Sequence, residues 1–146
     1  MVDKEKLDGL IAGNAFARYI GLELTGVAAG YAEGRIRMED YHTNVYEGMH
    51  GGCVYALADT IAGIAAATCG RYVTTLSGGM NYMLPVKDTE YVVCKARTVR
   101  QGGRIAVLDV VVENDGGDIL SNGSFNYYCT AKKLEEGHSL REMVKQ

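Results

Sequence analysis

One carboxylate stands in the middle of a strongly apolar stretch of this sequence. Residues 49–70 read MHGGCVYALADTIAGIAAATCG, a helical run in which Asp59 has no charged neighbour three or four positions away. An acid on a solvated helix face would share its stripe with Lys, Glu or Gln. We therefore interpret Asp59 as a functional group. The structural alternatives are a cap for a neighbouring segment or a buried hydrogen bond to the backbone.

Two glycines, Gly51 and Gly52, stand where this helix is expected to begin. The first N–H groups of a helix have no partners inside it and lie at the positive end of its dipole. Without side chains to screen them, such donors suit a phosphate, a carboxylate or a developing oxyanion. A tight turn leading into the helix is the structural alternative.

The spacing of the two features bears on how they could act together. Eight residues separate Gly51 from Asp59, which is roughly 12 Å along a helix axis. Groups that act on one carbonyl must lie within about 3–3.5 Å of the reacting atoms. One helix cannot easily bring both groups to the same carbonyl, so the spacing predicts a dimer whose active site takes groups from both chains.

The rest of the sequence predicts the elements that would surround this helix. They are a helical segment within residues 1–20 with a break near Gly13 and Asn14, a hairpin of strands at 21–27 and 31–38, a polar loop at 39–48, four strands in antiparallel succession after Gly70, and a C-terminal tail at 135–146. A helix that is apolar nearly all round must be covered on most sides. We therefore expect a single α+β domain over residues 1–146, in which a curved antiparallel sheet wraps the long helix.

Composition excludes several function classes. The 146 residues are 47% apolar and 23% charged, as in globular proteins, and the net charge of −3 argues against nucleic-acid or anionic-membrane binding. The sequence shows no apolar run of the roughly 20 residues that span a membrane and no secretory signal, so we expect a cytoplasmic protein. The cysteines lack metal-ligand spacing, and we expect free, buried thiols and no metal site. They are Cys53, Cys69, Cys94 and Cys129.

Three segments resemble one known family. HTNVYEGMHGGCVYALADTIAGIAA, at 42–66, is similar to the signature of the hotdog-fold thioesterases of the PaaI-like acyl-CoA thioesterase family, in which an Asn, a His-Gly-Gly and an Ala-Asp pair follow one another. YVTTLSGGMNYMLPVKD, at 72–88, resembles the following strand of that family. GRIAVLDVVVENDGGDILSNGSFNYY, at 103–128, resembles its closing strands. The resemblance covers about 21–130, most of the chain.

The resemblance implies a fold, an assembly and an activity. It implies a hotdog fold with a long central helix, homodimers that form one continuous sheet, and pairing of these dimers into a homotetramer. It implies hydrolysis of a small or medium acyl- or aryl-CoA thioester at sites between subunits, without a metal or a bound cofactor. A non-catalytic acyl-CoA-binding domain and a hotdog hydratase or dehydratase that uses His50 with Asp59 remain the alternatives.

Position by position, the resemblance also implies roles for five residues. Asp59 corresponds to the catalytic acid, either the general base for water or the nucleophile. Gly51 corresponds to the residue whose N–H polarises the thioester carbonyl. Asn44 helps to hold the carbonyl or the water, and Thr75 positions the water. His50 orders the loop or contacts the thioester end.

Further residues are expected to bind substrate. Gly52 belongs to a stripe of small residues that would let a ligand come close, or would equally serve tight packing of the helix on a sheet. Tyr82 could line an acyl pocket, or could simply lie on a half-buried strand. Basic side chains at strand ends could hold the phosphates of CoA, with a solvated strand end as the structural alternative. These are Lys87, Arg100 and Arg104. His42 and His138 are expected at the surface.

Overall fold

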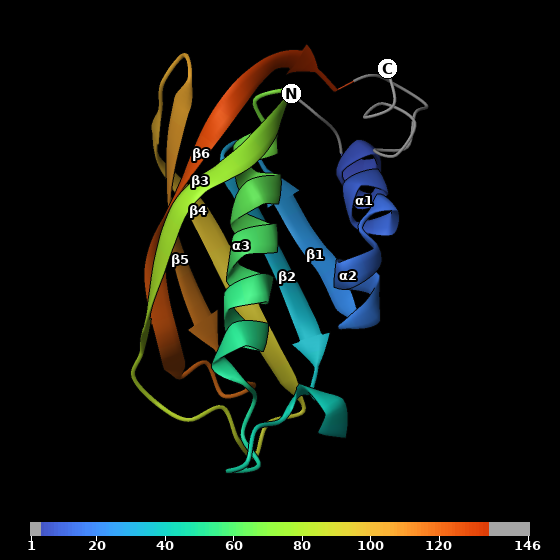
Figure 1. The fold of residues 1–146 in the computed structure, drawn as a ribbon, viewed down its shortest axis with the longest axis vertical. Coiled ribbons are helices and arrows are strands. Elements are labelled where there is room, and N and C mark those ends of the chain that lie inside the picture. The colour runs from blue at the N-terminus through green and yellow to red at the C-terminus, as the bar shows by residue number, and fades with distance from the viewer. Residues whose placement is uncertain (1–3, 135–146) are drawn as a thin grey trace.

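The computed structural model describes residues 4–134, where a curved antiparallel sheet wraps a long helix (Figure 1). The elements in chain order are α1 (Lys4–Gly13), α2 (Ala15–Tyr19), β1 (Leu22–Ala28), β2 (Tyr31–Arg37), the 3-10 turn η1 (Asp40–His42), α3 (Gly51–Ala67), β3 (Arg71–Tyr82), β4 (Tyr91–Gln101), β5 (Ile105–Glu113) and β6 (Ile119–Lys133). This confirms the α+β hotdog architecture expected from the sequence. The predicted tail at 135–146 and His138 lie outside the described residues.

The long helix α3 is bounded by side-chain and backbone caps. His50 is its N-cap residue, and the ring nitrogen Nδ1 accepts from the N–H of Gly52 at 2.8 Å. At the other end, Gly70 has a φ of 91°, a left-handed conformation that glycine adopts readily and that ends the turn after the helix. The helix therefore occupies the middle of the predicted stretch.

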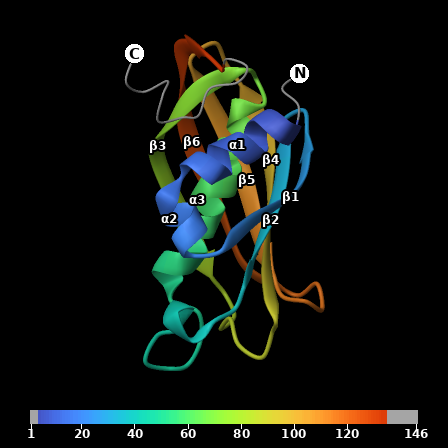
Figure 2. The same ribbon diagram turned by 90° about the vertical axis from the view of Figure 1, so that its right-hand side faces the viewer.

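Helices α1 and α2 cover the side of α3 that the sheet leaves open (Figure 2). Leu7 and Ala17 are fully buried. The predicted break falls at Asn14, whose side-chain oxygen accepts from the N–H of Ala17 at 3.0 Å and so caps α2. The amino-terminal segment thus forms the remaining wall around α3.

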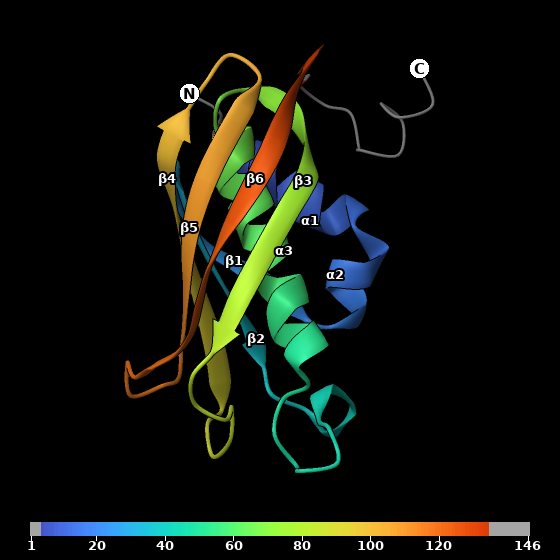
Figure 3. The same ribbon diagram turned by 60° about the vertical axis from the view of Figure 1, so that its left-hand side comes forward.

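The strands do not pair in the order of the chain. The sheet runs β1-β2-β4-β5-β6-β3, so β3 pairs with β6 at one edge and has no contact with β4 in the ladder (Figure 3). The predicted antiparallel succession of the last four strands is therefore wrong for β3 and right for β4, β5 and β6. The reason is that β2 already occupies the other side of β4, with Ile36 across from Val92.

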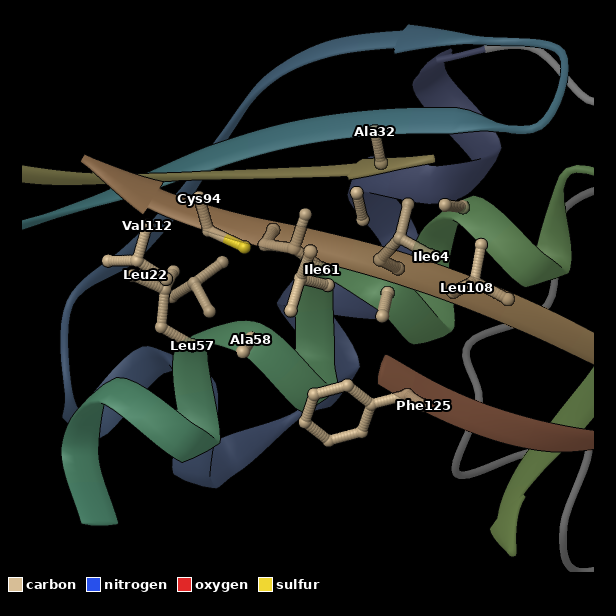
Figure 4. Close-up of a cluster of buried hydrophobic side chains, with 14 of the residues drawn as sticks. Leu22, Ala32, Leu57, Ala58, Ile61, Ile64, Cys94, Leu108, Val112 and Phe125 are labelled. Atoms are coloured by element: carbon tan, nitrogen blue, oxygen red, sulfur yellow. The ribbon is translucent and has the colours of Figure 1, made fainter. Parts of the chain in front are cut away.

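The core lies between α3 and the concave face of the sheet (Figure 4). Strands β4 and β5 alternate between buried and more exposed positions, as expected of strands with one face on a core. The helix contributes aliphatic side chains, and the strands contribute aliphatic, thiol and aromatic groups. Labelled members of this cluster are Leu57, Ala58, Ile61, Ile64, Cys94, Leu108, Val112 and Phe125.

The cysteines are only partly as expected. All four are free thiols, and Cys94 and Cys129 are buried, but Cys53 is half-buried and Cys69 is exposed. Cys69 lies in the turn just after α3, beyond the part of the helix that the sheet covers, so the prediction of a buried thiol is wrong there. No helix within residues 4–134 has the length and apolar character needed to span a membrane.

Candidate active site

The carboxylate of Asp59 is held on one oxygen by two hydroxyl groups. Thr75 on β3 donates its Oγ1 proton to Oδ1 of Asp59 over 2.8 Å. The hydroxyl of Tyr127 on β6 lies 2.8 Å from the same oxygen and 2.6 Å from the backbone carbonyl of Asp59. Within residues 4–134 no group donates to Oδ2 of Asp59. The carboxylate is therefore fixed in orientation and keeps one oxygen for chemistry.

Tyr127 is a site residue that sequence reasoning missed. Its side chain is 2% exposed, and burial together with the nearby Asp59 carboxylate raises the pKa of Tyr127 above its usual value, so it remains a hydroxyl donor. The available signal was the alternation in SFNYYC. There Phe125, Tyr127 and Cys129 share the buried face of β6 while Tyr128 is exposed.

The N–H of Gly51 is the one donor of the first turn of α3 without an acceptor in the described part of the chain. The backbone carbonyl of His50 accepts from Cys53 at 2.8 Å and from Val54 at 3.2 Å. The N–H of Gly52 is taken by Nδ1 of His50. A substrate oxygen at the start of α3 would therefore meet Gly51, whereas Gly52 contributes its small size and not its N–H.

His50 is placed as a helix cap. Because Nδ1 accepts from Gly52, the neutral ring carries its proton on Nε2. A ring nitrogen that is already engaged at the helix start is poorly placed to take a proton from substrate. This geometry favours the role of His50 in ordering the loop over a role as general base.

The loop before α3 is organised by Asn44. Its side-chain oxygen accepts from the N–H of Tyr46 at 2.9 Å and from that of Gly48 at 3.3 Å. The backbone N–H of Asn44 donates to the carbonyl of Gly48 at 2.8 Å. The side-chain NH₂ group of Asn44 is the part of the amide that remains to meet a substrate.

His42 is buried, which corrects the expectation of a surface histidine. Its ring is 3% exposed, with Nε2 2.8 Å from the carbonyl of Ile20 and Nδ1 accepting from the N–H of Glu39 at 3.0 Å. Its backbone carbonyl accepts from His50 at 2.8 Å. Buried polar groups in proteins are held by such bonds, and these join the loop to α2 and to the start of α3.

Two predicted substrate-binding side chains lie at the start of α3. The hydroxyl of Tyr82 donates to the carbonyl of Gly51 at 2.8 Å, and its half-exposed ring lies against that glycine. Lys87 is exposed and passes beside Gly48 in the loop before the helix. Tyr82 therefore lies against Gly51, and Lys87 lies beside the loop that leads to it.

The two predicted arginines lie elsewhere. Arg100 and Arg104 flank the connection between β4 and β5, at the end of the molecule where α3 finishes (Figures 1 and 3). Both are exposed. Within one chain they are separated from Gly51 and Lys87 by the length of α3, which is about 25 Å for its 17 residues.

The absence of a side chain at Gly78 allows β3 to lie close to the core. A side chain at Gly78 would collide with the ring of Phe125 and with the hydroxyl of Tyr55, whereas Gly79 has open space beside it. The hydroxyl of Tyr55 donates to the carbonyl of Gly78 at 3.2 Å. This close approach keeps β3, and with it Thr75, against α3.

A cavity of about 210 Å³ opens beside Asp59 and Thr75, between α1, α3 and β3. The nearest thiol along α3 is Cys53, and burial raises the pKa of Cys53 to about 11. A thiol with that pKa is protonated at neutral pH, so Cys53 is a poor nucleophile. The carboxylate of Asp59 is the group in this region that can attack or can activate water.

Comparisons with known proteins identify the family of this chain. Residues 46–121 match the family model of the thioesterase superfamily. The chain is 29% identical to acyl-coenzyme A thioesterase 13 of Homo sapiens over 124 residues, which are 82% of this chain and 89% of that protein.

Solved structures give the same fold. A mutant of the phenylacetic acid degradation protein PaaI from Thermus thermophilus superposes with a TM-score of 0.76 at 26% identity, over 80% of this chain and 100% of that one. A Streptococcus mutans protein solved bound to acetyl-CoA gives a TM-score of 0.73 at 25% identity, over 77% and 90%. The family model covers more than half of the sequence, including the helix that carries Asp59. The chain belongs to the thioesterase superfamily, and it is a thioester hydrolase with the hotdog fold of the PaaI-like proteins.

Proposed function

We propose that this protein hydrolyses acyl-CoA thioesters to a free acid and CoA, with Asp59 as the catalytic carboxylate. The observation that carries the proposal is the carboxylate itself: Oδ1 is fixed by Thr75 and Tyr127, Oδ2 accepts no hydrogen bond from residues 4–134, and Asp59 lines a cavity. The names of two similar proteins, one called an acyl-coenzyme A thioesterase and one solved with acetyl-CoA, support the class of substrate.

The reaction needs only groups that the fold supplies. Oδ2 of Asp59 takes a proton from water while the water oxygen bonds to the thioester carbon. The carbonyl oxygen becomes an oxyanion, and the N–H of Gly51 stabilises it. The tetrahedral intermediate then collapses, the carbon–sulfur bond breaks, and the departing CoA thiolate receives the proton from Asp59.

The same carboxylate could instead attack the thioester carbon directly. An acyl–Asp59 anhydride would form, and water would then hydrolyse it. One turnover in ¹⁸O-labelled water distinguishes the routes. If Asp59 is the general base, the label enters only the released acid. If Asp59 is the nucleophile and water attacks the Asp59 carbonyl of the anhydride, the label from the first turnover enters the side chain of Asp59, and the released acid carries an oxygen from Asp59.

We also propose that Asp59 and Gly51 in one site come from two chains. They lie eight residues apart on the single helix α3, about 12 Å along the axis, which is too far for both to reach one carbonyl. Within residues 4–134 no strand pairs with the outer side of the edge strand β3, whose backbone groups there are available for pairing. Antiparallel pairing of two β3 strands would extend the sheet across a dimer with a two-fold axis.

The proposed dimer has a defined register. Thr75 is hydrogen-bonded to Asp59, and Tyr82 is hydrogen-bonded to the carbonyl of Gly51. If Asp59 of one chain and Gly51 of the other share a site, the partner's Tyr82 must lie across from Thr75. That register places the two-fold axis between Gly78 and Gly79. It also turns the β4–β5 end of one chain toward the Lys87 end of the other, so that Arg100 and Arg104 could join Lys87 around the CoA phosphates. A further pairing of such dimers gives the proposed homotetramer.

The experiment for the proposed activity uses Asp59→Asn, which keeps the shape of the side chain and removes its basicity. Free-thiol release from a panel of acyl-CoA esters is followed for both proteins. Loss of a positioned general base lowers turnover by about 10²–10⁴-fold, with unchanged circular dichroism. Near-native turnover of Asp59→Asn on every ester would refute the role of Asp59. Hydration of enoyl-CoA without thiol release would indicate a hydratase, and binding without turnover would indicate a non-catalytic binding domain.

A further inference from the structure

The connection between β3 and β4 carries Lys87. It lies at the same end of the molecule as the β5–β6 turn and the loop before α3 (Figure 3). Asp115 of the β5–β6 turn reaches across to the start of β4. Its Oδ2 accepts from the N–H of Glu90 at 2.7 Å, and its Oδ1 accepts from the N–H of Tyr91 at 3.1 Å. One carboxylate therefore holds two consecutive backbone groups, 25 and 24 residues earlier in the chain.

The backbone of Asp115 adds to this contact through Thr89. The N–H of Asp115 donates to Oγ1 of Thr89 at 3.0 Å, and that hydroxyl donates to the carbonyl of Tyr91 at 2.8 Å. The N–H of Glu90 is the main cause that lowers the pKa of Asp115 below its usual value, because a donor to a carboxylate favours its ionised form. Asp115 thus fastens the β5–β6 turn to residues 89–91.

The other end of the segment that carries Lys87 is fastened to the loop before α3. The carbonyl of Val86, a buried residue, accepts from the N–H of Met49 at 3.0 Å. Met49 stands directly before the N-cap residue of α3. Lys87 and Asp88 are the residues between Val86 and Thr89. The contact with Met49 on one side and the contact with Asp115 on the other therefore fix the backbone that carries Lys87.

The side chain of Lys87 is placed to meet an anion. Its carbons lie beside Gly48, where an added Cβ atom would be 3.4 Å from Cγ and 3.5 Å from Cε of Lys87. Within residues 4–134 the structure records no ion pair of Lys87. The stem thus packs on the loop before α3 while the ammonium group is available to a negatively charged part of a ligand.

We propose that Asp115 is a positioning residue for the substrate, because it holds Lys87 in place to bind a phosphate group of the CoA moiety. This inference rests on the proposed thioesterase function and adds to it a residue that acts through Lys87. A lysine on a fixed segment loses less conformational entropy on binding phosphate than a lysine on a loose segment. Loss of the Asp115 contact should therefore weaken binding of the CoA moiety and leave the chemical step unchanged.

Hydrogen exchange tests the contact itself. Asp115→Ala removes both acceptor oxygens and is expected to fold, because Asp115 is exposed in a turn. Asp118→Ala is the matched control, since the carboxylate of Asp118 accepts from Nδ2 of Asn114 at 3.2 Å within the same turn. We expect the protection of the Glu90 and Tyr91 amides to fall at least threefold in Asp115→Ala and to stay unchanged in Asp118→Ala. Unchanged protection in Asp115→Ala would refute the contact.

Calorimetric titration with CoA at low ionic strength tests the consequence for binding, without hydrolysis. An exposed charge pair changes affinity by up to about fivefold. We expect CoA to bind about fivefold more weakly to Lys87→Ala, about threefold more weakly to Asp115→Ala, and with wild-type affinity to Asp118→Ala. The double variant should bind no more weakly than Lys87→Ala, because Asp115 acts through Lys87. Wild-type affinity of Asp115→Ala, or fully additive losses in the double variant, would overturn the proposal.

A substrate without phosphates separates this role from a general structural defect. An N-acetylcysteamine thioester keeps the thioester group and lacks the nucleotide. Asp115→Ala should raise KM about threefold for the CoA ester with kcat unchanged, and it should leave both constants unchanged for the N-acetylcysteamine ester. An equal loss on both esters would refute the positioning role. If the wild-type protein hydrolyses neither ester, the proposed activity fails, and the CoA titration still tests Asp115.

Discussion

Replacing Gly51 with proline removes one N–H group and leaves the helix intact. Gly51 is the first residue of α3, the position at which proline is most favourable in a helix. The preceding residue, His50, has φ −56° and ψ 134°, which is the conformation that a following proline requires. No intrahelical hydrogen bond is lost, because the N–H groups of the first turn, that of Gly51 included, have no acceptor within the helix.

The size of the effect follows from the proposed role of this donor. Loss of one oxyanion-hole donor lowers kcat by about 10²–10³-fold, or about 2.7–4 kcal/mol of transition-state stabilisation. Gly51→Ala is the matched control, since it keeps the N–H and adds a Cβ atom 3.4 Å from the ring of Tyr82. We therefore expect a large fall in kcat for Gly51→Pro and a small change for Gly51→Ala.

The assay is thiol release from a medium-chain acyl-CoA, with kcat and KM determined separately. Circular dichroism and the thermal midpoint establish that both variants fold. Because the donor acts mainly on the oxyanion, the loss should appear in kcat more than in KM. If Gly51→Pro keeps a kcat within threefold of Gly51→Ala, the assignment of the oxyanion donor is wrong.

The same variant tests whether two chains share a site. Gly51→Pro and Asp59→Asn chains are unfolded together, refolded as a mixture, and assayed. In random two-fold dimers half of the molecules contain one chain of each kind. If the sites are shared between chains, one of the two sites in each mixed dimer has both its Asp59 and its Gly51 intact. Activity then returns to about one quarter of the wild-type value. If each chain carries its own complete site, every site contains a defect and the mixture remains inactive.

Three other substitutions test the groups around the site. Thr75→Val removes the donor to Oδ1 of Asp59. Hydrogen bonds to charged groups contribute about 1.5–3 kcal/mol, so kcat should fall by at least tenfold. Thr75→Ser keeps the hydroxyl and should keep most of the wild-type kcat. Tyr127→Phe leaves the carbonyl of Asp59 without its hydroxyl donor, so urea unfolding should show a loss of about 1–3 kcal/mol; an unchanged unfolding midpoint would contradict the buried hydrogen bond. His42→Ala leaves the carbonyl of Ile20 and the N–H of Glu39 unpaired and should lower stability by at least about 2 kcal/mol, whereas equal stability would mean that water replaces the ring.

The edge strand connects the fold to the proposed assembly. Gly78 can lie against Phe125 because it has no side chain, and this contact holds β3 close to α3. The outer side of β3 then carries backbone groups without a partner strand in the described chain. A strand edge of 12 residues is a surface that proteins cover or pair, and the proposed pairing with a second copy would both cover the edge and complete the proposed site.

The sequence alone determined the elements and the acid. Helical spacing around Asp59, the glycines at 51 and 52, and the β-forming segments after Gly70 depend on local periodicity and turn chemistry, which a sequence displays directly. The absence of charged neighbours around Asp59 was sufficient to single it out. The separation of Gly51 from Asp59 was also fixed by sequence, because the rise of a helix is constant.

Only the tertiary structure decided which distant residues meet Asp59. Tyr127 lies 68 positions away in the chain and reaches Asp59 because β6 crosses under α3, and no local pattern encodes such a contact. Strand β3 pairs with β6 and not with β4, because β2 pairs with the side of β4 that faces away from β5. Pairing of β2 and pairing of β3 with β4 are competing long-range contacts. The burial of His42 likewise depends on the carbonyl of Ile20, 22 residues earlier. In each case the deciding interaction joins segments that only folding brings together.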